Sequence, residues 1–324
     1  MLKIIVGCYE QMLLGYSVTK DKEKDVLKSE LLFTDHSHSG CIKTVACGSS
    51  YLASGSSDEA IFLFDMTDDK EVGSIQGHEG TVNYLTFPDK KFLMSTSDDG
   101  TINVWRVSAK WDKAKCLRGH KGPVTSFAVH PSGKLALSAS PKDGTLRTWN
   151  MISGRPVYVK NMKKFSPEIV KFSPGGEHYL ITSKNCLQIY ELESANCIAE
   201  IEWKKAILAA EFISNKLIAV TGEGNEIHIY QTKNGESVTK IEAHTSRVKD
   251  LHRITPPKFL IDSDTDNSLI WLASASSDGH VKIWSVDEQK LTDESTSVLK
   301  SPPCVLDIDT KARVTCLTSW ESKT

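Results

Sequence analysis

The sequence has 324 residues, 40% of them hydrophobic, and a formal net charge of −2 at pH 7. This balance excludes a general polyanion binder, although it leaves room for a local basic patch. No apolar run approaches the ~20 residues that span a bilayer, so we expect no membrane segment. Only three apolar residues follow Lys3 before Gly7, and we expect no secretory signal.

A short phrase that ends in an aromatic residue recurs along the chain. Its clearest copy is Ser-Asp-Asp-Gly-Thr-Ile-Asn-Val-Trp at residues 97–105, and successive aromatics are 48, 41, 44, 41, 40 and 54 residues apart. Such a period is typical of β-propeller blades, which stack around a ring because one blade cannot bury its apolar faces alone. The seven closing aromatics are Tyr16, Phe64, Trp105, Trp149, Tyr190, Tyr230 and Trp284.

The two ends of the chain predict one blade that they build together. Residues 5–16 align without gaps on residues 53–64 and supply two outer strands, while residues 313–320 have the pattern of the missing inner strands. Closing the ring in this way pairs strand edges that would otherwise be exposed. We therefore expect an all-β, seven-bladed propeller that forms a single domain over residues 1–324. Residues 20–28 are predicted to form a charged surface loop.

Four of the repeats carry a second landmark. A histidine stands four residues before a branched apolar residue, and an aspartate stands six residues before the closing aromatic. These phrases resemble the WD-repeat family, in which histidine, aspartate, serine and tryptophan form a buried hydrogen-bonded chain. The resemblance assigns three such chains, His78, Asp99 and Trp105, then His120, Asp143 and Trp149, then His244, Asp278 and Trp284, with Ser97, Ser140 and Ser276 as the nearest hydroxyls. A fourth, with His38 and Asp58, is shortened because Phe64 lacks an indole N–H.

These polar sets predict a scaffold role and not an active site, because the same set recurs in every regular blade. A buried tryptophan whose donor is satisfied both packs and orients its blade. The sequence contains no nucleotide-binding glycine loop, zinc-protease motif or calcium loop. We therefore expect no catalytic residues, no cofactor and no metal site.

The later repeats are less regular. Those near residues 164–190 and 204–230 have lost both histidine and aspartate. The next one holds the largest insertion, with Pro256-Pro257 and the acidic residues 262–266, which predicts an exposed loop, and residues 287–297 predict a second polar loop. The cysteines have no metal-ligand spacing, and we expect four of them to be small buried residues with reduced thiols. These four are Cys47, Cys186, Cys197 and Cys316.

Basic residues crowd in three stretches, which could present a face to RNA phosphates or to an acidic protein, or could be ordinary solvated loops. Loops that precede the inner strands lie at the same rim of the ring as the aspartate-bearing turns, and binding residues usually lie on such loops. The stretches hold Lys110, Lys113, Lys115, Arg118 and Lys121, then Arg155, Lys160, Lys163 and Lys164, then Arg247, Lys249, Arg253 and Lys258. The predicted partner-binding rim gathers Glu79, Lys121, Lys142, Lys204 and Arg247 from five different blades.

Particular stretches carry a closer resemblance, at residues 7–11, 130–138, 145–150, 244–250 and 312–317. Together they are similar to the PAK-interacting WD-repeat protein family, counterparts of the yeast maintenance-of-killer WD-repeat factor. The resemblance implies a non-enzymatic scaffold in large ribosomal subunit biogenesis, located in the nucleus and nucleolus. Its implied partners are proteins of the pre-large-subunit particle and rRNA, with the chain acting as a monomeric propeller within a larger complex. Functions that depend on the Lys-rich tail of animal members are not expected of residues 1–324.

Three alternatives stay open at this point. The same resemblance implies a negative regulator of p21-activated kinases that binds the regulatory region of the kinase. A ubiquitin-ligase substrate receptor is less favoured, because such receptors usually show Trp-Asp-x-Arg at the blade ends, whereas residues 105–106, 149–150 and 284–285 are Trp-Arg, Trp-Asn and Trp-Ser. An enzyme has no supporting set of residues.

Overall fold

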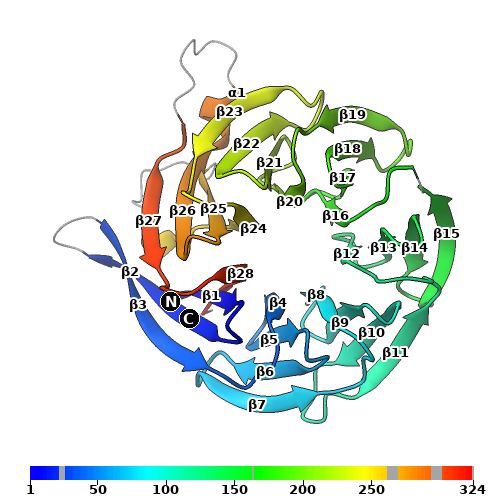
Figure 1. Cartoon of the computed structure of the whole chain (residues 1–324), viewed down its shortest axis with the longest axis horizontal. Coiled ribbons are helices and arrows are strands. Elements are labelled where there is room, and N and C mark those ends of the chain that lie inside the picture. The colour runs from blue at the N-terminus through cyan, green and yellow to red at the C-terminus, as the bar shows by residue number, and fades with distance from the viewer. Residues whose placement is uncertain (22–25, 163, 261–268, 293–300, 323–324) are drawn as a thin grey trace.

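The computed structural model describes residues 1–21, 26–162, 164–260, 269–292 and 301–322. Its strands form seven four-stranded antiparallel sheets that stand around a central opening (Figure 1). The predicted all-β, seven-bladed propeller is therefore confirmed. The first strand of each sheet lies at the centre of the ring and the fourth lies at the circumference. None of the helices within the described ranges is long and apolar enough to cross a membrane.

Six blades follow one another along the chain, and we number them 1 to 6. Within each blade, hydrogen-bonded neighbours are consecutive in sequence. Blade 1 contains β4 (Ile42–Gly48), β5 (Tyr51–Ser56), β6 (Ile61–Asp65) and β7 (Lys70–Ile75). Blade 2 contains β8 (Val82–Thr86), β9 (Phe92–Ser97), β10 (Thr101–Arg106) and β11 (Lys113–Arg118). Blade 3 contains β12 (Ser126–Val129), β13 (Leu135–Ser140), β14 (Thr145–Asn150) and β15 (Arg155–Asn161).

The next three blades keep the same order. Blade 4 contains β16 (Ile169–Phe172), β17 (His178–Thr182), β18 (Cys186–Glu191) and β19 (Cys197–Glu202). Blade 5 contains β20 (Ile207–Phe212), β21 (Leu217–Gly222), β22 (Glu226–Gln231) and β23 (Ser237–Glu242). Blade 6 contains β24 (Val248–Ile254), β25 (Leu269–Ser276), β26 (His280–Asp287) and β27 (Cys304–Asp309).

The seventh, shared blade is built from both ends of the chain, as predicted. From the centre outward its strands are β28 (Val314–Glu321), β1 (Leu2–Cys8), β2 (Leu13–Asp21) and β3 (Val26–Asp35). Ile5 lies opposite Thr318, and Val6 lies opposite Leu317. The predicted division of strands was wrong, because the N-terminal part supplies three strands and the C-terminal part supplies only the innermost one.

The segment predicted to be a charged loop, residues 20–28, is also wrong, because the prediction missed the outermost strand of the shared blade. β2 continues to Asp21 and β3 begins at Val26, so most of this segment is strand, while residues 22–25 lie outside the described residues. Every residue of β3 is exposed or half-buried. An outermost strand of this kind lacks the alternation of buried and exposed residues that identifies a strand from sequence.

A β-bulge accompanies the closing aromatic in all seven blades. In each one the pairing of the third strand with the fourth shifts by one residue immediately before the aromatic. Bulges increase the local twist of a strand, and their repetition at one position twists the blades alike. The shifts lie at Gly15/Tyr16, Leu63/Phe64, Val104/Trp105, Thr148/Trp149, Ile189/Tyr190, Ile229/Tyr230 and Ile283/Trp284.

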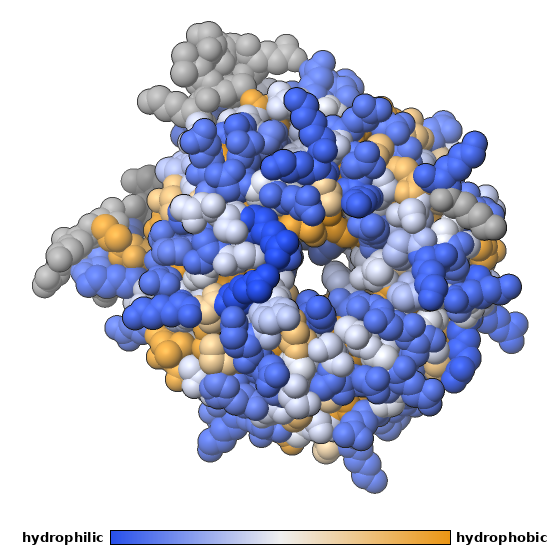
Figure 2. All heavy atoms as spheres, in the orientation of Figure 1, coloured by the Kyte–Doolittle hydropathy of each residue, from blue (hydrophilic) through white to orange (hydrophobic). Residues whose placement is uncertain are grey.

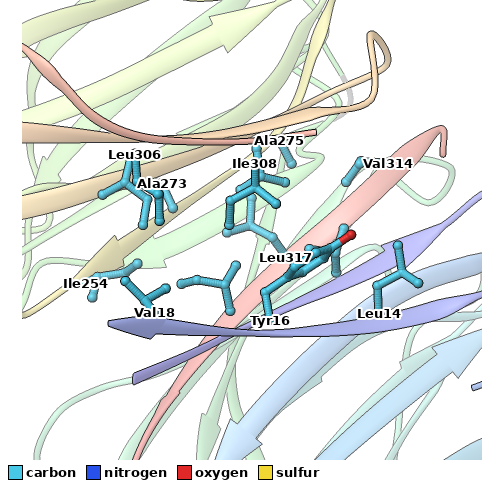
Figure 3. Close-up of a cluster of buried hydrophobic side chains, with 14 of the residues drawn as sticks. Leu14, Tyr16, Val18, Ile254, Ala273, Ala275, Leu306, Ile308, Val314 and Leu317 are labelled. Carbon is cyan, nitrogen blue, oxygen red and sulfur yellow. The ribbon is translucent and has the colours of Figure 1, made fainter. Parts of the chain in front are cut away.

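The hydrophobic core consists of clusters between neighbouring blades. In one such cluster, Tyr16 and Val18 of the shared blade are buried together with Ile308 of blade 6 (Figure 3). Burying one large aliphatic side chain contributes ~1.5–3 kcal/mol. The closing aromatics therefore join blades to each other, and not only strands within a blade.

Three further predictions need correction or fall outside the described residues. The segment 287–297, predicted to be a polar loop, begins with a short helix, α1 (Glu288–Thr292), in which Leu291 is buried. Its remainder, residues 293–297, lies outside the described residues, as does the acidic stretch 262–266. All eight cysteines are free, and Cys316 is buried, but Cys197 is exposed at the start of outer strand β19 while Cys47 and Cys186 are half-buried.

Candidate interaction surface

Each regular blade contains a chain of hydrogen bonds that links two loops to the sheet. In blade 2, Nδ1 of His78 lies 2.8 Å from Oδ2 of Asp99, and its Nε2 lies 2.7 Å from Oγ of Ser95. Nε1 of Trp105 donates to the same Oγ at 2.8 Å. An ionised aspartate only accepts hydrogen bonds, so Nδ1 of the imidazole donates to it, and Nε2 accepts from the serine.

Blades 3 and 6 repeat this geometry. The distances from His Nδ1 to Asp Oδ2 are 2.9 Å in blade 3 and 3.2 Å in blade 6, and those from Trp Nε1 to Ser Oγ are 2.8 and 2.9 Å. Blade 1 keeps His38, which lies 2.9 Å from Asp58 and 2.8 Å from Ser54. Its closing residue Phe64 donates nothing, so the chain ends at the serine.

The serines in these chains are not the ones predicted. Ser95, Ser138 and Ser274 hold the tryptophan and histidine, each two residues before the predicted Ser97, Ser140 and Ser276. Residues two apart in a strand face the same side of the sheet, so strand periodicity could not distinguish the two serines. Ser97 donates instead to the carbonyl of Gly80, and the buried Oγ of Ser140 has no hydrogen-bond partner.

Protonation states follow from burial and from the loop amides. Burial lowers the pKa of His120 and that of His244, which favours the neutral imidazole. Burial alone would raise the pKa of Asp278, but N–H groups of Thr245 and His280 donate to its carboxylate and lower the pKa to about 2. An ionised carboxylate that accepts such bonds holds neutral histidine in one tautomer and orientation.

The aspartates also fix the backbone of the rim. Oδ2 of Asp99 accepts from N–H of Glu79 at 3.1 Å, and Oδ2 of Asp143 accepts from N–H of Lys121 at 3.0 Å. Each carboxylate thereby ties the loop before its blade's inner strand to the turn that follows the second strand. The side chains of Glu79 and Lys121 are exposed, so they project from loops whose backbone is held in place.

The five residues of the predicted rim lie at one end of the ring, but on four blades and not five. The antiparallel order of strands places the loops before the first strands and the turns after the second strands at this end. Lys121 and Lys142 both belong to blade 3, where a Cβ on Gly122 would lie 2.9 Å from Cβ of Lys142. Each blade has two loops at the rim, and the prediction assigned the two loops of blade 3 to two different blades. Lys142 and Lys204 are exposed, and Arg247 is half-buried.

Charges are distributed unequally around this rim. The rim loops of blades 1 and 2, residues 36–41, 57–60, 76–81 and 98–100, contain no lysine or arginine. Figure 2 shows one face of the ring, where strongly hydrophilic side chains lie on one side of the central opening and hydrophobic ones also reach its edge. In blades 3 to 5 the rim loops carry more basic than acidic residues within the described ranges. The basic ones are Lys121, Lys142, Lys164, Lys184, Lys204 and Lys205, and the exposed or half-buried acids not bonded to a histidine are Glu168 and Glu223.

A second group of cations at the mouth of the opening was only partly predicted. Burial and the nearby charges of Arg247, Arg313 and Lys43 lower the pKa of Lys249. Arg313 also stacks over the exposed ring of Tyr9 at 4.9 Å. Lys43 and Arg313 come from opposite ends of the sequence, and the shared blade brings them together. No local pattern in the sequence could have indicated this group.

The predicted basic stretches do not form continuous faces. Lys113 lies on outer strand β11, where it donates to the carbonyl of Gly77 at 3.0 Å and stacks over Trp105, so it holds the loop that enters blade 2 against the outer part of that blade. Lys160 on β15 stacks over the ring of Tyr190 in blade 4 at 4.2 Å. Lys163 and the side chain of Lys258 lie outside the described residues.

The opening itself contains a polar cavity of about 360 Å³. Within it, Nζ of Lys171 lies 2.9 Å from Oε2 of Glu211. Burial raises the pKa of Asp250 to about 6 and lowers that of His252 to about 4. Across the described residues, no three His, Cys, Asp or Glu side chains are grouped so as to hold a metal ion.

Comparison with known proteins places this geometry in a family. The model for "WD domain, G-beta repeat" matches residues 69–106, 111–150 and 235–285. These matches fall on the repeats whose histidine, aspartate, serine and tryptophan are hydrogen-bonded. The chain is thus a WD-repeat propeller, a class that generally serves as a non-enzymatic scaffold for protein interactions.

Longer similarities cover nearly the whole chain. It is 38% identical to "p21-activated protein kinase-interacting protein 1-like" of Xenopus laevis over 98% of this chain and 82% of that protein. The chain belongs to the p21-activated protein kinase-interacting protein 1 family. Two fungal relatives of this family are more distant. "Protein MAK11" of Saccharomyces cerevisiae is 27% identical and "Shk1 kinase-binding protein 15" of Schizosaccharomyces pombe is 29% identical, each over 89% of this chain and 78% of the relative.

Proposed function

We propose that this chain is a non-enzymatic scaffold in large ribosomal subunit biogenesis, which docks on pre-large-subunit particles in the nucleolus. The observation that carries the proposal is the unequal charge of the rim. Exposed lysines extend from the rim loops of blades 3 to 5, whereas the rim loops of blades 1 and 2 are acidic or neutral. Basic residues on a rigid surface suit the phosphates of rRNA, and the net charge of −2 confines that attraction to one arc. The family resemblance supports the same assignment.

The rim also suits the docking of a particle in one orientation. The bond from Glu79 N–H to Asp99 and the bond from Lys121 N–H to Asp143 hold the rim loops of blades 2 and 3. Positioned loops bind at a lower entropic cost than mobile loops do. Glu79 on the acidic arc disfavours phosphate on that side, so the charge pattern orients the particle as well as attracting it.

The test is charge reversal at two rim residues, Lys121→Glu together with Arg247→Glu. Co-sedimentation with pre-large-subunit particles on a sucrose gradient should weaken, and the difference from the wild type should shrink at higher salt, because salt screens the contacts that the variant has lost. Thermal stability should change by only ~0.5 kcal/mol, as is usual for surface substitutions. Lys90→Glu with Lys216→Glu, which reverses two exposed lysines at the opposite end of the ring, is the matched control and should sediment like the wild type.

A second candidate function is regulation of a p21-activated kinase through its regulatory region. The names of the relatives favour it, since they describe a kinase-interacting protein and a Shk1 kinase-binding protein. A kinase adaptor would remain in the light gradient fractions and would bind a purified kinase regulatory segment. Full retention of the rim variant on particles would place the docking surface elsewhere. Absence of the wild-type chain from particles would reject the ribosomal proposal.

A further inference from the structure

The outer edge of blade 3 exposes a longer run of large apolar residues than the other outer strands within the described ranges. Among the described residues, β15 is the outermost strand of its sheet, and one of its two edges has no neighbouring strand (Figure 1). Three consecutive large apolar residues on it are exposed, Val157 by 64%, Tyr158 by 61% and Val159 by 43%. Ile152, in the turn that leads into the strand, is 77% exposed. The bulge of this blade lies at Val157, because Trp149 pairs with Pro156 and Thr148 with Tyr158. Beyond the bulge, Tyr158 and Val159 face opposite sides, so both faces of β15 present apolar surface beside an open edge.

Other outer strands have charges where β15 has apolar groups. Charged side chains on an edge strand discourage pairing with another chain, and most propeller edges here follow this rule. In β15 the charges stand only near the ends, at Arg155 and Lys160, and the centre has none. Exposed charges occupy other outer strands at Lys113 and Lys115 of β11, Glu200 and Glu202 of β19, Lys240 and Glu242 of β23, and Asp307 and Asp309 of β27.

The charge around this edge is of one sign. From residue 144 to residue 167 the sequence contains five basic residues and no aspartate or glutamate. Nζ of Lys115, from the neighbouring blade, adds a further charge by donating to the carbonyl of Ser153 at 2.5 Å. A strand that pairs with β15 therefore meets apolar side chains at its centre and positive charge at its ends.

We propose that the free edge of β15 binds an extended peptide segment of a partner protein as a fifth strand of blade 3. The segment that fits has alternating apolar residues at its centre and acidic residues on both sides. Main-chain hydrogen bonds supply affinity in such strand addition, and the side chains that flank the edge supply specificity. Because β15 lies on the circumference, this surface is distinct from the rim and can be occupied while the rim is engaged.

A second copy of this chain fits the edge less well. Antiparallel pairing of two β15 strands about Tyr158 places Arg155 of each copy beside the positive end of the other, and parallel pairing in register places each charge on its own equivalent. Like charges on directly opposed strands destabilise the pair. The charge pattern therefore favours a partner of opposite charge over self-association.

The test uses the full chain and a fluorescent synthetic peptide with alternating valine and threonine at its centre and aspartates on both sides. Fluorescence anisotropy should show saturable binding to the wild type, and Val157→Asp should weaken it by about tenfold or more. Val72→Asp is the matched control, because Val72 is 50% exposed on outer strand β7, and it should leave binding unchanged. Amide hydrogen exchange in the complex should slow in β15 and not in β7.

Three outcomes would overturn the proposal. Equal binding by the wild type and the Val157→Asp variant would show that the peptide does not bind at this edge. Equal binding of a peptide with lysines in place of the aspartates would remove the charge argument. Concentration-dependent dimerisation of the wild type that Val157→Asp abolishes would make a second copy the occupant. Thermal melts of both variants that match the wild type verify that binding differences do not arise from unfolding.

Discussion

Blades 2, 3 and 6 and blades 4 and 5 have the same four strands and the same bulge, but their interiors are built in different ways. In the former, a histidine, a serine and a tryptophan are joined by hydrogen bonds. In the latter, the closing aromatics are Tyr190 and Tyr230, and the position of the serine is taken by Ile181 and Val220, both fully buried. The propeller therefore does not need the polar chain in each of its blades.

Stacked rings replace the chain in blade 4. The rings of Tyr179 and Tyr190 lie 5.1 Å apart and nearly parallel, at 7°. The Tyr190 hydroxyl donates to Gln188 at 2.8 Å, so its polar group is satisfied without a serine. Aromatic pairs of this kind contribute ~0.5–1.5 kcal/mol beyond the area that they bury.

In blade 5 a tryptophan and a histidine ring pack together, in positions that are reversed relative to blade 1. Trp203 stands four residues before the first residue of β20, where the regular blades have histidine, and it packs on His228 at 4.8 Å. In blade 1 the corresponding pair is His38 at the first position and Phe62 at the second, 4.6 Å apart. An aromatic contact between the loop and the third strand is therefore retained after the hydrogen bonds are lost.

The difference between these blades indicates that the hydrogen-bonded chain is needed where the closing aromatic is a tryptophan. A buried indole N–H must find an acceptor, and the serine that accepts from it also binds the histidine. Where the closing residue is tyrosine, this demand disappears, and an isoleucine or valine fills the space. Replacing both partners of a buried hydrogen bond by apolar groups can be nearly neutral, whereas removing one partner alone is costly. A buried indole therefore requires its serine, whereas blade 1 keeps histidine, aspartate and serine with Phe64 as the closing residue.

Deleting residues 1–17 should have the largest effect. The shared blade has no histidine, serine and tryptophan chain, yet the deletion removes all of β1 and the start of β2, which leaves β28 without its neighbour. Cooperative unfolding should be lost and the protein should aggregate, because strand edges are exposed. Size-exclusion chromatography and a thermal melt measure this, and a soluble monomer of unchanged stability would contradict it. A peptide of residues 1–21 added in trans should restore solubility.

Trp149→Ala should lower the free energy of unfolding by ~3–5 kcal/mol, the range for removing a large buried aromatic. Trp149 is 1% exposed, and its loss also leaves Ser138 without a donor. Trp149→Phe, which copies Phe64 of blade 1, should cost less because the ring still packs. Chemical denaturation gives both values. A wild-type midpoint for the alanine variant would mean that Trp149 does not join blade 3 to its neighbour.

Exchanging one serine at a time tests whether the chain acts as a unit. Ser138→Ala leaves Trp149 Nε1 and His120 Nε2 unpaired and should cost ~2–3 kcal/mol. Ser140→Ala is the matched control two residues away, and because its buried Oγ has no partner, the substitution should be nearly neutral or slightly stabilising. Equal effects of the two substitutions would reject the assignment of Ser138.

Acidification should produce the smallest effect per side chain. Burial lowers the pKa of His120 and that of His244, so the unfolded chain binds protons first as the pH falls below ~6.5. Their contribution to stability is present above that pH and is lost as the pH falls toward the folded pKa, by at most ~1.4 kcal/mol per histidine one unit below. Thermal melts at several pH values should give a shallower dependence for His120→Gln with His244→Gln. An unchanged slope would show that neither histidine is buried in its neutral form.

The fold could be predicted from the sequence because the period and the closing aromatics recur along the chain, and because the two ends match parts of one repeat. The sequence could not show whether Ser138 or Ser140 binds the tryptophan and the histidine, since both face the same side of β13. Only the position of the His120 ring distinguishes them. The prediction assigned Lys121 and Lys142 to different blades, because one blade sends two loops to the rim. The exchange of rings between Trp203 and His228 has no repeated pattern at all, and only packing in blade 5 shows it.

The cations at the mouth of the opening could not be predicted for a related reason. Lys43 and Arg313 approach each other only after the two ends of the chain have paired. The exposed edge of β15 was within reach of sequence reasoning, since its apolar centre is plain in the residues. What the sequence did not show is that β15 is the outermost strand, with no neighbour to cover it.

The pairing of β1 with β28 also sets an order in time. Thr315, at the start of β28, donates to the carbonyl of Gly7 in β1, 308 residues away. At a synthesis rate of ~5–20 residues per second, β1 leaves the ribosome roughly 15–60 s before its inner neighbour exists. Throughout that interval the first strand made has an unpaired edge, and the ring cannot close before β28 has been synthesised. Completion of this propeller therefore waits for its last strand, and β1 is the segment that a nascent-chain chaperone would need to shield.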